Sequence, residues 1–195
     1  MDGDNFAINR ILEEAANLVG GSKESAGNAE QTEGYKRKQI ERLKEFATIH
    51  SLWIDCSALS LTFLSKGGEN EVFYDGNLSV IKLNNFEYAG DDLTNFFIRI
   101  KAHNLFFCNI AYRMIGFAYN SQNEFCAVLV QSFVRARREA TEKEIQHYME
   151  SLGFCMDYPD EFHNEQYEIF DAVPNNVLHG IDGQLYFIDT QIRLR

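Results

Sequence analysis

The sequence has few prolines, little positive charge and no long apolar run, and each shortage excludes a class of protein. Only 2 of the 195 residues are proline, whereas 45% are hydrophobic and 13% are aromatic, so the chain is neither collagen-like nor mainly disordered. No stretch approaches the ~18 apolar residues of a membrane span. The acidic start Met1-Asp2-Gly3-Asp4 also lacks the basic and apolar segments of a signal peptide. We therefore expect a soluble, cytoplasmic, globular protein that does not contact a membrane.

Positive charge is scarce, because 18 Lys and Arg residues face 29 Asp and Glu residues, for a net charge of -11 and a pI near 4.9. Nucleic acids and anionic membranes require a cationic surface, so neither is expected as the main ligand. A local basic run of Arg135, Arg137 and Arg138 is interpreted as a solvated turn before a helix.

The cysteines and histidines form no metal-binding or disulfide pattern. The four cysteines are widely spaced without a C-x-x-C pair, as is typical of reduced thiols in an intracellular protein. They are Cys56, Cys108, Cys126 and Cys155. The five histidines show no spacing typical of metal ligands.

The length fits about one domain of ~150 residues, and composition divides the chain further. Residues 5–19 carry apolar side chains at helical spacing, and Gly20-Gly21 end this amphipathic helix. Residues 20–34 contain nothing aliphatic larger than alanine, which predicts a flexible linker. We expect the main domain to span 35–195 and to begin with a helix over about 35–51.

After this helix the apolar period changes from helical to alternating. Strands are predicted over about 59–64, 71–74 and 78–83, then a helix from Asp91, then strands over 112–119 and 124–131. Thr141 and Glu144 have the spacing of a capping box for a helix that Gly153 ends, and short strands follow from 166 to 195. A strand-rich half before a helical half predicts an α+β domain of two lobes.

Several residues have the types and spacing that phosphoryl transfer requires. The turn containing Gly67 and Gly68 joins two strands, and glycines allow the backbone to approach a phosphate. Lys82 lies in an apolar strand between Ile81 and Leu83, from which it could reach the same phosphates. The alternatives are an ordinary turn at the glycines and a solvated strand lysine at Lys82.

A second group follows towards the end of the chain. Asp171 and Asn176 have the Asp-x4-Asn spacing of a kinase catalytic loop, and Asp189 ends the apolar run that follows. A hairpin through Asp182-Gly183 would bring Asn176 and Asp189 to one end of two strands. Two such oxygen ligands suit Mg²⁺, which binds few protein groups together with phosphates and water.

With these motifs the sequence resembles the serine/threonine/tyrosine-kinase-like domain of polyvalent proteins from bacterial phages and conjugative elements, especially in Bacteroides-type genomes. The resemblance covers about Leu52 to Ile192. It is carried by residues 68–72, 80–82, 103–106, 115–117, 130–134 and 141–154, by Asp171, by 176–178 and by 182–189.

The resemblance implies a protein-kinase-like fold with a small antiparallel N-lobe over about 52–131 and a truncated helical C-lobe over about 135–195. It implies that Lys82 and the 67–68 turn hold the phosphates of ATP and that Gln131 and Phe133, in the segment from Val130, receive the adenine. It further implies that Asp171 is the catalytic base and that Asn176 and Asp189 bind Mg²⁺.

The sequence also departs from the kinase pattern. No His-Arg pair precedes Asp171, Thr190-Gln191 stands where Phe-Gly is expected, and the helix from Asp91 contains no Glu. The acidic partner of Lys82 therefore stays open among Glu87, Asp91 and Asp92. Two hypotheses follow: an ATP- and Mg²⁺-dependent phosphotransferase with an unknown acceptor, or an inactive kinase-fold module that binds a protein partner, with the 5–19 helix as one candidate surface.

Overall fold

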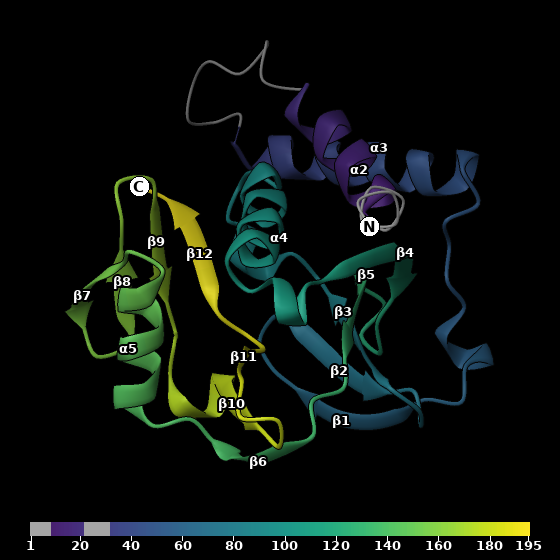
Figure 1. The fold of residues 1–195 in the computed structure, drawn as a ribbon. Helices are drawn as coiled ribbons and strands as arrows, with labels where there is room; N and C mark the ends of the chain where they lie inside the picture. Colours follow the sequence, from purple (N-terminus) through teal and green to yellow (C-terminus); the bar gives the residue numbers. More distant parts are fainter. Residues whose placement is uncertain (1–8, 22–31) are drawn as a thin grey trace. The chain divides into compact units, whose positions relative to one another are not determined.

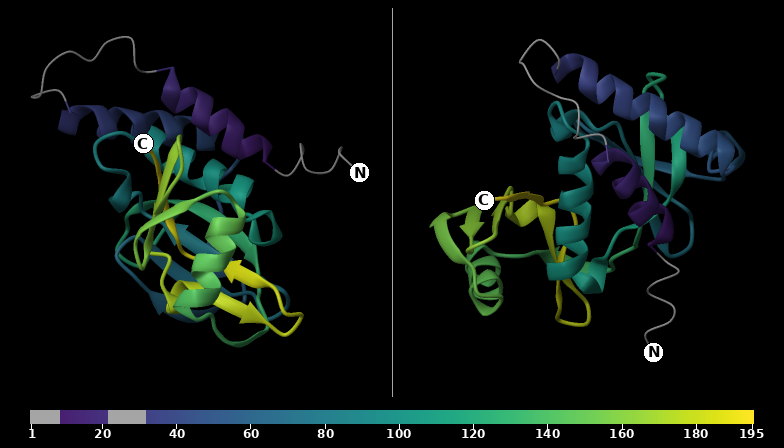
Figure 2. Two further views of the ribbon diagram at one scale, coloured as in Figure 1. Left: turned by 60° about the vertical axis from the view of Figure 1, so that its left-hand side comes forward. Right: turned by 90° about the horizontal axis from the view of Figure 1, so that it is seen from above.

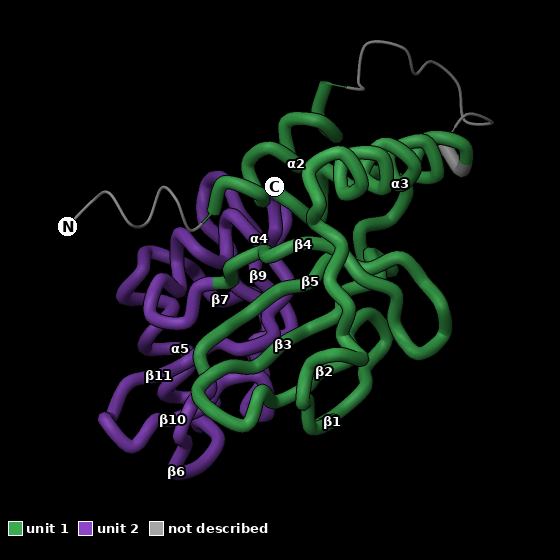
Figure 3. The backbone as a smooth tube through the Cα atoms, turned by 90° about the vertical axis from the view of Figure 1, so that its right-hand side faces the viewer, with its two compact units in different colours: residues 1–97, 112–132 green, residues 98–111, 133–195 purple. Residues whose placement is uncertain are grey.

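The structure is a computed structural model that describes residues 9–21 and 32–195 (Figure 1). Its helices and antiparallel sheets confirm the predicted α+β class. The chain divides into two compact units, residues 1–97 with 112–132 and residues 98–111 with 133–195 (Figure 3). Helix α4 (Thr94–Phe106) carries the chain from the first unit into the second. The predicted division into residues 52–131 and 135–195 remains a prediction.

Unit 1 is built on a five-stranded sheet in the order β1-β2-β3-β5-β4, in which all neighbouring strands are antiparallel. The strands are β1 (Thr62–Lys66), β2 (Asn70–Tyr74), β3 (Ser79–Asn84), β4 (Arg113–Tyr119) and β5 (Phe125–Ser132). These are the five strands that the alternating pattern predicts. Their ends differ from the prediction by a few residues because hydrogen bonding to neighbours, rather than the apolar pattern, decides where a strand begins and ends.

Both faces of this sheet carry buried side chains. Ile81 and Leu83 of β3 belong to an apolar cluster with side chains of β4 and β5. Successive strand residues point to opposite faces, so Val80, Lys82 and Asn84 lie on the other face. The apolar cluster consists of Ile81, Leu83, Ala118, Cys126, Val128 and Val130.

Two helices precede the sheet in unit 1, and Figure 2 shows them side by side. Helix α2 (Arg10–Gly20) contacts helix α3 (Thr32–Ile49) and strand β4, and its residues Leu12, Ala15 and Val19 are buried. Residues 5–8 of the predicted first helix and 22–31 of the predicted linker lie outside the described residues. Residues 32–34 belong to α3, which therefore begins before the predicted position 35.

The segment that joins α3 to the sheet runs along β4. The Phe117 amide donates to the Leu52 carbonyl over 2.9 Å, and the Ile54 amide donates to Phe117 over 2.8 Å. Trp53 stacks on Tyr119 with ring centres 5.3 Å apart. A Cβ at Gly116 would lie 2.2 Å from the Leu52 carbonyl oxygen, so this close approach requires glycine.

Unit 2 contains helix α5 (Glu142–Ser151) and two small antiparallel sheets. One sheet has the order β11-β10-β6 and the other β12-β9-β8-β7. Its strands are β6 (Ala136–Glu139), β7 (Cys155–Tyr158), β8 (Glu161–His163), β9 (Tyr167–Phe170), β10 (Val177–Gly180), β11 (Leu185–Phe187) and β12 (Gln191–Leu194). The core of unit 2 includes Phe107, Ile145, Met149, Phe162, Ile169, Val177 and Phe187.

The expectation of a mainly helical second half is wrong, because strands outnumber helices among the described residues of unit 2. Strands β6 and β7 are short and exposed, and β8 has only three residues, of which Phe162 is buried, so these strands show little apolar alternation in the sequence. Two residues of the basic run, Arg137 and Arg138, lie in strand β6 and not in a turn, and Arg135 directly precedes this strand. Arg137 donates to the Ile181 carbonyl over 2.9 Å, and Arg138 pairs with Glu144 over 2.7 Å.

No described helix is both long enough and apolar enough to cross a bilayer. The cysteines Cys56, Cys108, Cys126 and Cys155 are all free thiols. Cys126 is buried, which raises the pKa of its thiol to about 12 and keeps it protonated.

Candidate functional site

Unit 2 brings together three of the predicted site residues, Asp171, Asn176 and Asp189. The side-chain amide of Asn176 donates to the Asp171 backbone carbonyl over 2.9 Å. The Ile188 amide donates to the Asn176 backbone carbonyl, also over 2.9 Å, which places Asp189 one residue beyond this bond. The predicted hairpin through Asp182-Gly183 is present, since Val177 pairs with Phe187 and His179 with Leu185.

The strands β9 and β12 also bring the carboxylates of Asp171 and Asp189 together. Asp171 directly follows the last residue of β9, and Asp189 lies two residues before the first residue of β12. These strands pair in antiparallel register with Phe170 opposite Gln191. The loops that carry Asp171 and Asp189 therefore leave the same end of one sheet.

The charges in this cluster affect one another. Partial burial of the Asp171 carboxyl is the main cause that raises its pKa, and the negative charges of Asp189 and Asp160 raise it further, against a hydrogen bond from Asn176. Asp171 also has φ +60°, in the left-handed region that few non-glycine residues adopt. Such a backbone persists where its surroundings hold it.

The donor set of the cluster fits a hard cation. Asn176 and Asp189 offer an amide oxygen and carboxylate oxygens, which Mg²⁺ prefers over nitrogen or sulfur. Within the described residues, no group of three His, Cys, Asp or Glu side chains is arranged to hold a metal ion. An Asn–Asp pair does not depend on such a group, because Mg²⁺ completes its coordination with phosphate oxygens and water.

Lys82 lies in unit 1 and is buried, with 5% of its surface exposed, so the alternative of a solvated strand lysine is wrong. Its amine donates to the Tyr112 hydroxyl over 3.0 Å and lies 5.2 Å from the centre of that ring. Burying a lysine in a sheet is costly unless polar groups or an anionic ligand surround the charge. Sheet formation alone therefore does not explain why a lysine is buried at position 82.

Gln131 shares the sheet face of Lys82, because Val80 pairs with Gln131 where Lys82 pairs with Leu129. Its side chain is buried like that of Lys82. Phe133 follows β5, belongs to unit 2 and is exposed. The two residues that the resemblance assigns to adenine binding thus flank the point where the chain passes from unit 1 to unit 2.

The glycine turn between β1 and β2 is closed by a bond from the Gly67 amide to the Asn70 carbonyl over 2.9 Å. A Cβ at Gly67 would meet open space, whereas one at Gly68 would lie 2.1 Å from the Tyr88 hydroxyl. The ring of Tyr88 is therefore one reason for a glycine at position 68. The role of the turn in phosphate binding remains a prediction.

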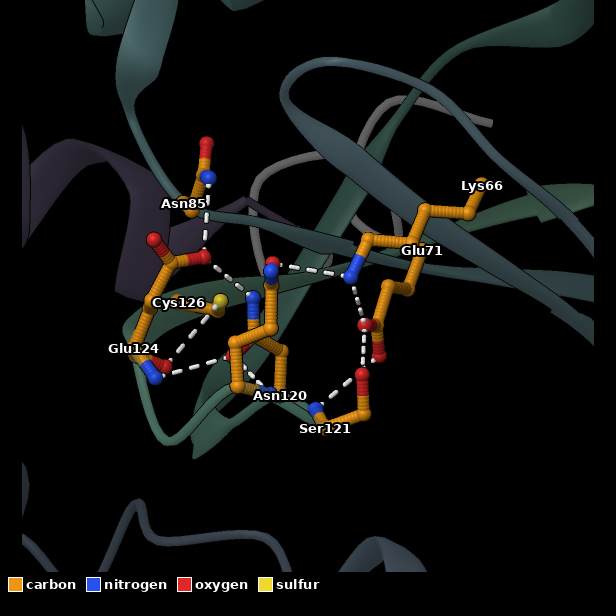
Figure 4. Close-up of polar contacts among 8 residues, drawn as sticks. Lys66, Glu71, Asn85, Asn120, Ser121, Glu124 and Cys126 are labelled. Carbon is orange, nitrogen blue, oxygen red and sulfur yellow. Dashed lines mark hydrogen bonds and ion pairs between the residues drawn. The ribbon is translucent and has the colours of Figure 1, made fainter.

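A polar network connects this β1–β2 hairpin to the turn between β4 and β5 (Figure 4). Lys66 donates to the buried carboxylate of Glu71 over 2.9 Å and to Gln122 over 2.8 Å, and the Ser121 amide donates to Glu71 over 3.1 Å. In the same turn, Asn120 donates to Glu124 over 2.7 Å. These bonds fix the strands on both sides of the glycine turn.

Helix α4 contains no acidic residue. Of the three acidic residues considered as partners of Lys82, the structure assigns a contact to Asp92. Asp92 accepts bonds from the Thr94 amide and from Gln39 of α3, each over 2.9 Å, so it caps the start of α4. Sequence reasoning also missed Arg99, a buried residue of α4 that donates to the Gln191 side chain. The sequence signal that could have identified Arg99 as buried is its position three residues after Phe96, close to the apolar face of the helix.

Comparison with known families gives this geometry a context. Residues 36–195 match the model of the family described as a serine/threonine/tyrosine kinase found in polyvalent proteins. The chain belongs to this family. Membership confirms the predicted kinase-like domain of polyvalent proteins, and the matched region includes both units from α3 to β12. No curated protein matches the sequence.

Proposed function

We propose that this member of the polyvalent-protein kinase family binds ATP with Mg²⁺ and transfers its terminal phosphoryl group to an acceptor hydroxyl. The observation that carries the proposal is the cluster of Asp171, Asn176 and Asp189 in unit 2. Two carboxylates and an amide from two separate loops lie at one end of paired strands, where the negative charges of Asp171 and Asp189 repel each other and a bound cation would relieve that repulsion.

Each residue of the cluster has a distinct role in the proposal. Asn176 and Asp189 would hold Mg²⁺, which neutralises the charge that develops on the transferred phosphoryl group. Asp171 would accept the proton of the attacking hydroxyl, and the Asn176 bond to its backbone keeps its loop in place for this.

Unit 1 would supply the groups that contact the nucleotide itself. Lys82 would bind the α- and β-phosphates, with the Tyr112 hydroxyl orienting its amine. The backbone of Gly67 and Gly68 would approach the phosphates, and Gln131 and Phe133 would lie beside the adenine. The five-stranded sheet and its connection to α4 are compatible with the small lobe of a protein-kinase-like fold, and unit 2 with a truncated large lobe.

The family also suggests the setting of the reaction. We propose that the chain acts in the cytoplasm of a bacterium that carries a phage or conjugative element, with Bacteroides-type genomes as the first place to look. Its partners would be a nucleotide and a protein acceptor. The net charge of -11 gives no support for nucleic acid or a membrane as the ligand.

Calorimetric titration tests the proposal. Mg-ATP is titrated into the wild-type protein, into Asp189→Asn and into Lys82→Met, with Asp157→Asn as a matched control because Asp157 is an exposed carboxylate of the same unit. The expected result is Mg²⁺-dependent binding that both site variants weaken by at least about tenfold, as removal of a charged contact does, and that the control retains.

Equal binding by the wild type and Asp189→Asn would contradict the proposed metal site. Absence of Mg-ATP binding in the wild type and in all variants would overturn the proposed function and favour the inactive kinase-fold module that binds a protein. The apolar face of α2 is not the surface for such a partner, because Leu12, Ala15 and Val19 are already buried.

A further inference from the structure

Arg99 is a buried cation on the part of α4 that belongs to unit 2. Only 6% of its surface is exposed, and its guanidinium donates to the side-chain oxygen of Gln191. A guanidinium carries five donors in a fixed plane, so burying it is favourable only where acceptors match that plane. The burial of Arg99 therefore depends on acceptors such as the Gln191 side chain.

The partner of Arg99 lies at the junction of the two candidate carboxylates. Gln191 is the first residue of β12, two positions after Asp189. Across the sheet it pairs with Phe170, the residue before Asp171. One hydrogen bond from α4 therefore reaches the point at which both carboxylate-bearing loops leave the β9–β12 pair.

The residues on both sides of Gln191 are buried and restrict its movement. Thr190, between Asp189 and Gln191, is buried, and Ile192 belongs to the core of unit 2. A shift of Gln191 along the strand would move Asp189 with it and would disturb its pairing with Phe170. Arg99 bonds the side chain of Gln191 from helix α4.

We infer that Arg99 is a positioning residue: through Gln191 it fixes Asp189 relative to Asp171, and so sets the affinity of the site for a divalent cation. The inference rests on the proposed function for the identity of the cation, and on the contacts above for the positioning. Residues that orient metal ligands from behind typically change metal affinity 10–100-fold when they are lost.

The first readout is the Mg²⁺ concentration that gives half-maximal ATP binding. Arg99→Met and Gln191→Leu each remove one side of the bond, and each is expected to raise this concentration about tenfold or more. Gln191→Glu keeps acceptor oxygens for the guanidinium, so it is expected to stay near the wild-type value. Arg193→Met is the matched control, because Arg193 is an exposed arginine of the same strand that pairs with Glu168.

The second readout needs no ligand. The Ile188 amide is bonded to the Asn176 carbonyl next to Asp189, and its hydrogen exchange in the free protein reports on the position of that segment. Arg99→Met and Gln191→Leu are expected to accelerate this exchange at least about tenfold, while exchange at the Phe162 and Ile169 pair of β8 and β9 is unchanged.

The two readouts separate the possible failures. A wild-type protein that does not bind Mg-ATP overturns the proposed function, and selective acceleration at Ile188 would still support positioning by Arg99. Uniform acceleration at all amides would show that Arg99 only stabilises the unit, which contradicts the inference. An unchanged Mg²⁺ requirement in Gln191→Leu, a half-buried position where loss of folding is least expected, would also overturn it.

Discussion

Glu71 lies in a short strand between Asn70 and Val72, and nothing in that pattern distinguishes it from a solvated carboxylate. In the structure it is buried and accepts bonds from Lys66 and Ser121, two residues far apart in the sequence. Burial alone would raise the pKa of Glu71, but these hydrogen bonds outweigh it and lower the pKa below its usual value.

The lowered pKa of Glu71 predicts a pH-dependent contribution to stability. A group whose pKa is lower in the folded state stabilises that state above its unfolded pKa and loses the effect as the pH falls. Glu71→Gln is therefore expected to cost about 1–3 kcal/mol near pH 7, with the difference from wild type shrinking below the ordinary value of 4.5. Urea unfolding across this pH range measures it.

Glu45→Gln serves as the control, because Glu45 is exposed on α3. A difference between Glu71→Gln and wild type that stays constant from neutral pH to below pH 4 would show that the carboxylate charge is not involved.

Gly116 shows how one missing side chain permits a tertiary contact. A Cβ there would collide with the backbone oxygen of Leu52, which cannot move without breaking its bond to Phe117. Gly116→Ala is expected to lower the free energy of unfolding by about 1–3 kcal/mol, as overpacking does. Gly67→Ala, where a Cβ meets open space, is the comparison, and equal losses for the two variants in urea unfolding would refute the argument.

Site residues could be predicted where the local sequence carries the chemistry. The hairpin through Asp182-Gly183 was sufficient to predict that Asn176 and Asp189 lie at one end of two strands, since hairpin pairing is local, whereas the β9–β12 pairing that brings Asp171 to Asp189 is not local. Arg99 could not be assigned, because its bond to Gln191 joins positions that no local pattern relates. The partner of Lys82 stayed open for the same reason, and Tyr112 is one that the sequence did not indicate.

Elements with strong local preferences were predicted best. The capping box of α5 is present as expected, with Glu144 accepting from the Thr141 amide over 2.8 Å. Bonds from Arg138 and then from Thr141 hold the pKa of Glu144 well below its usual range. Strands β7 and β8 were missed because they have only four and three residues, and strands this short are defined by pairing with their neighbours more than by apolar periodicity.

Helix α2 supports a prediction at the level of elements. Leu12 is buried against the rest of unit 1, so Leu12→Ala is expected to cost about 2–5 kcal/mol of stability, as the loss of a core leucine does. Asn17→Ala, on the exposed face of the same helix, should leave stability almost unchanged. Thermal or urea unfolding compares them, and a neutral Leu12→Ala would mean that α2 is not part of the unit's core.

Over the whole molecule, the order of predicted strands and helices gave the α+β class, whereas the division into units follows from long-range contacts. Residues 98–111 belong to unit 2 although residues on both sides of them belong to unit 1. A discontinuous unit of this kind leaves no mark in composition, and the boundary at α4 lies within a continuous helical pattern.

The net charge of -11 leads to a prediction for solution behaviour. Mutual repulsion keeps copies of the chain apart at pH 7, and this repulsion disappears as the pH approaches the pI near 4.9. Light scattering is expected to show growing particles between pH 7 and pH 5, with circular dichroism confirming that the fold persists. Particle size that does not depend on pH would argue that the charges are not spread over the surface.

Trp53 is the only tryptophan in the chain, and it stacks on Tyr119 within unit 1 while its indole N–H donates to Thr48 over 3.0 Å. Selective excitation of tryptophan therefore produces emission from unit 1 alone, whereas tyrosines occur in both units. The protein thus carries its tryptophan in the unit that contains Lys82, and the unit that contains Asp171 and Asp189 has no tryptophan. A tryptophan introduced into unit 2 would give that unit an optical probe of its own.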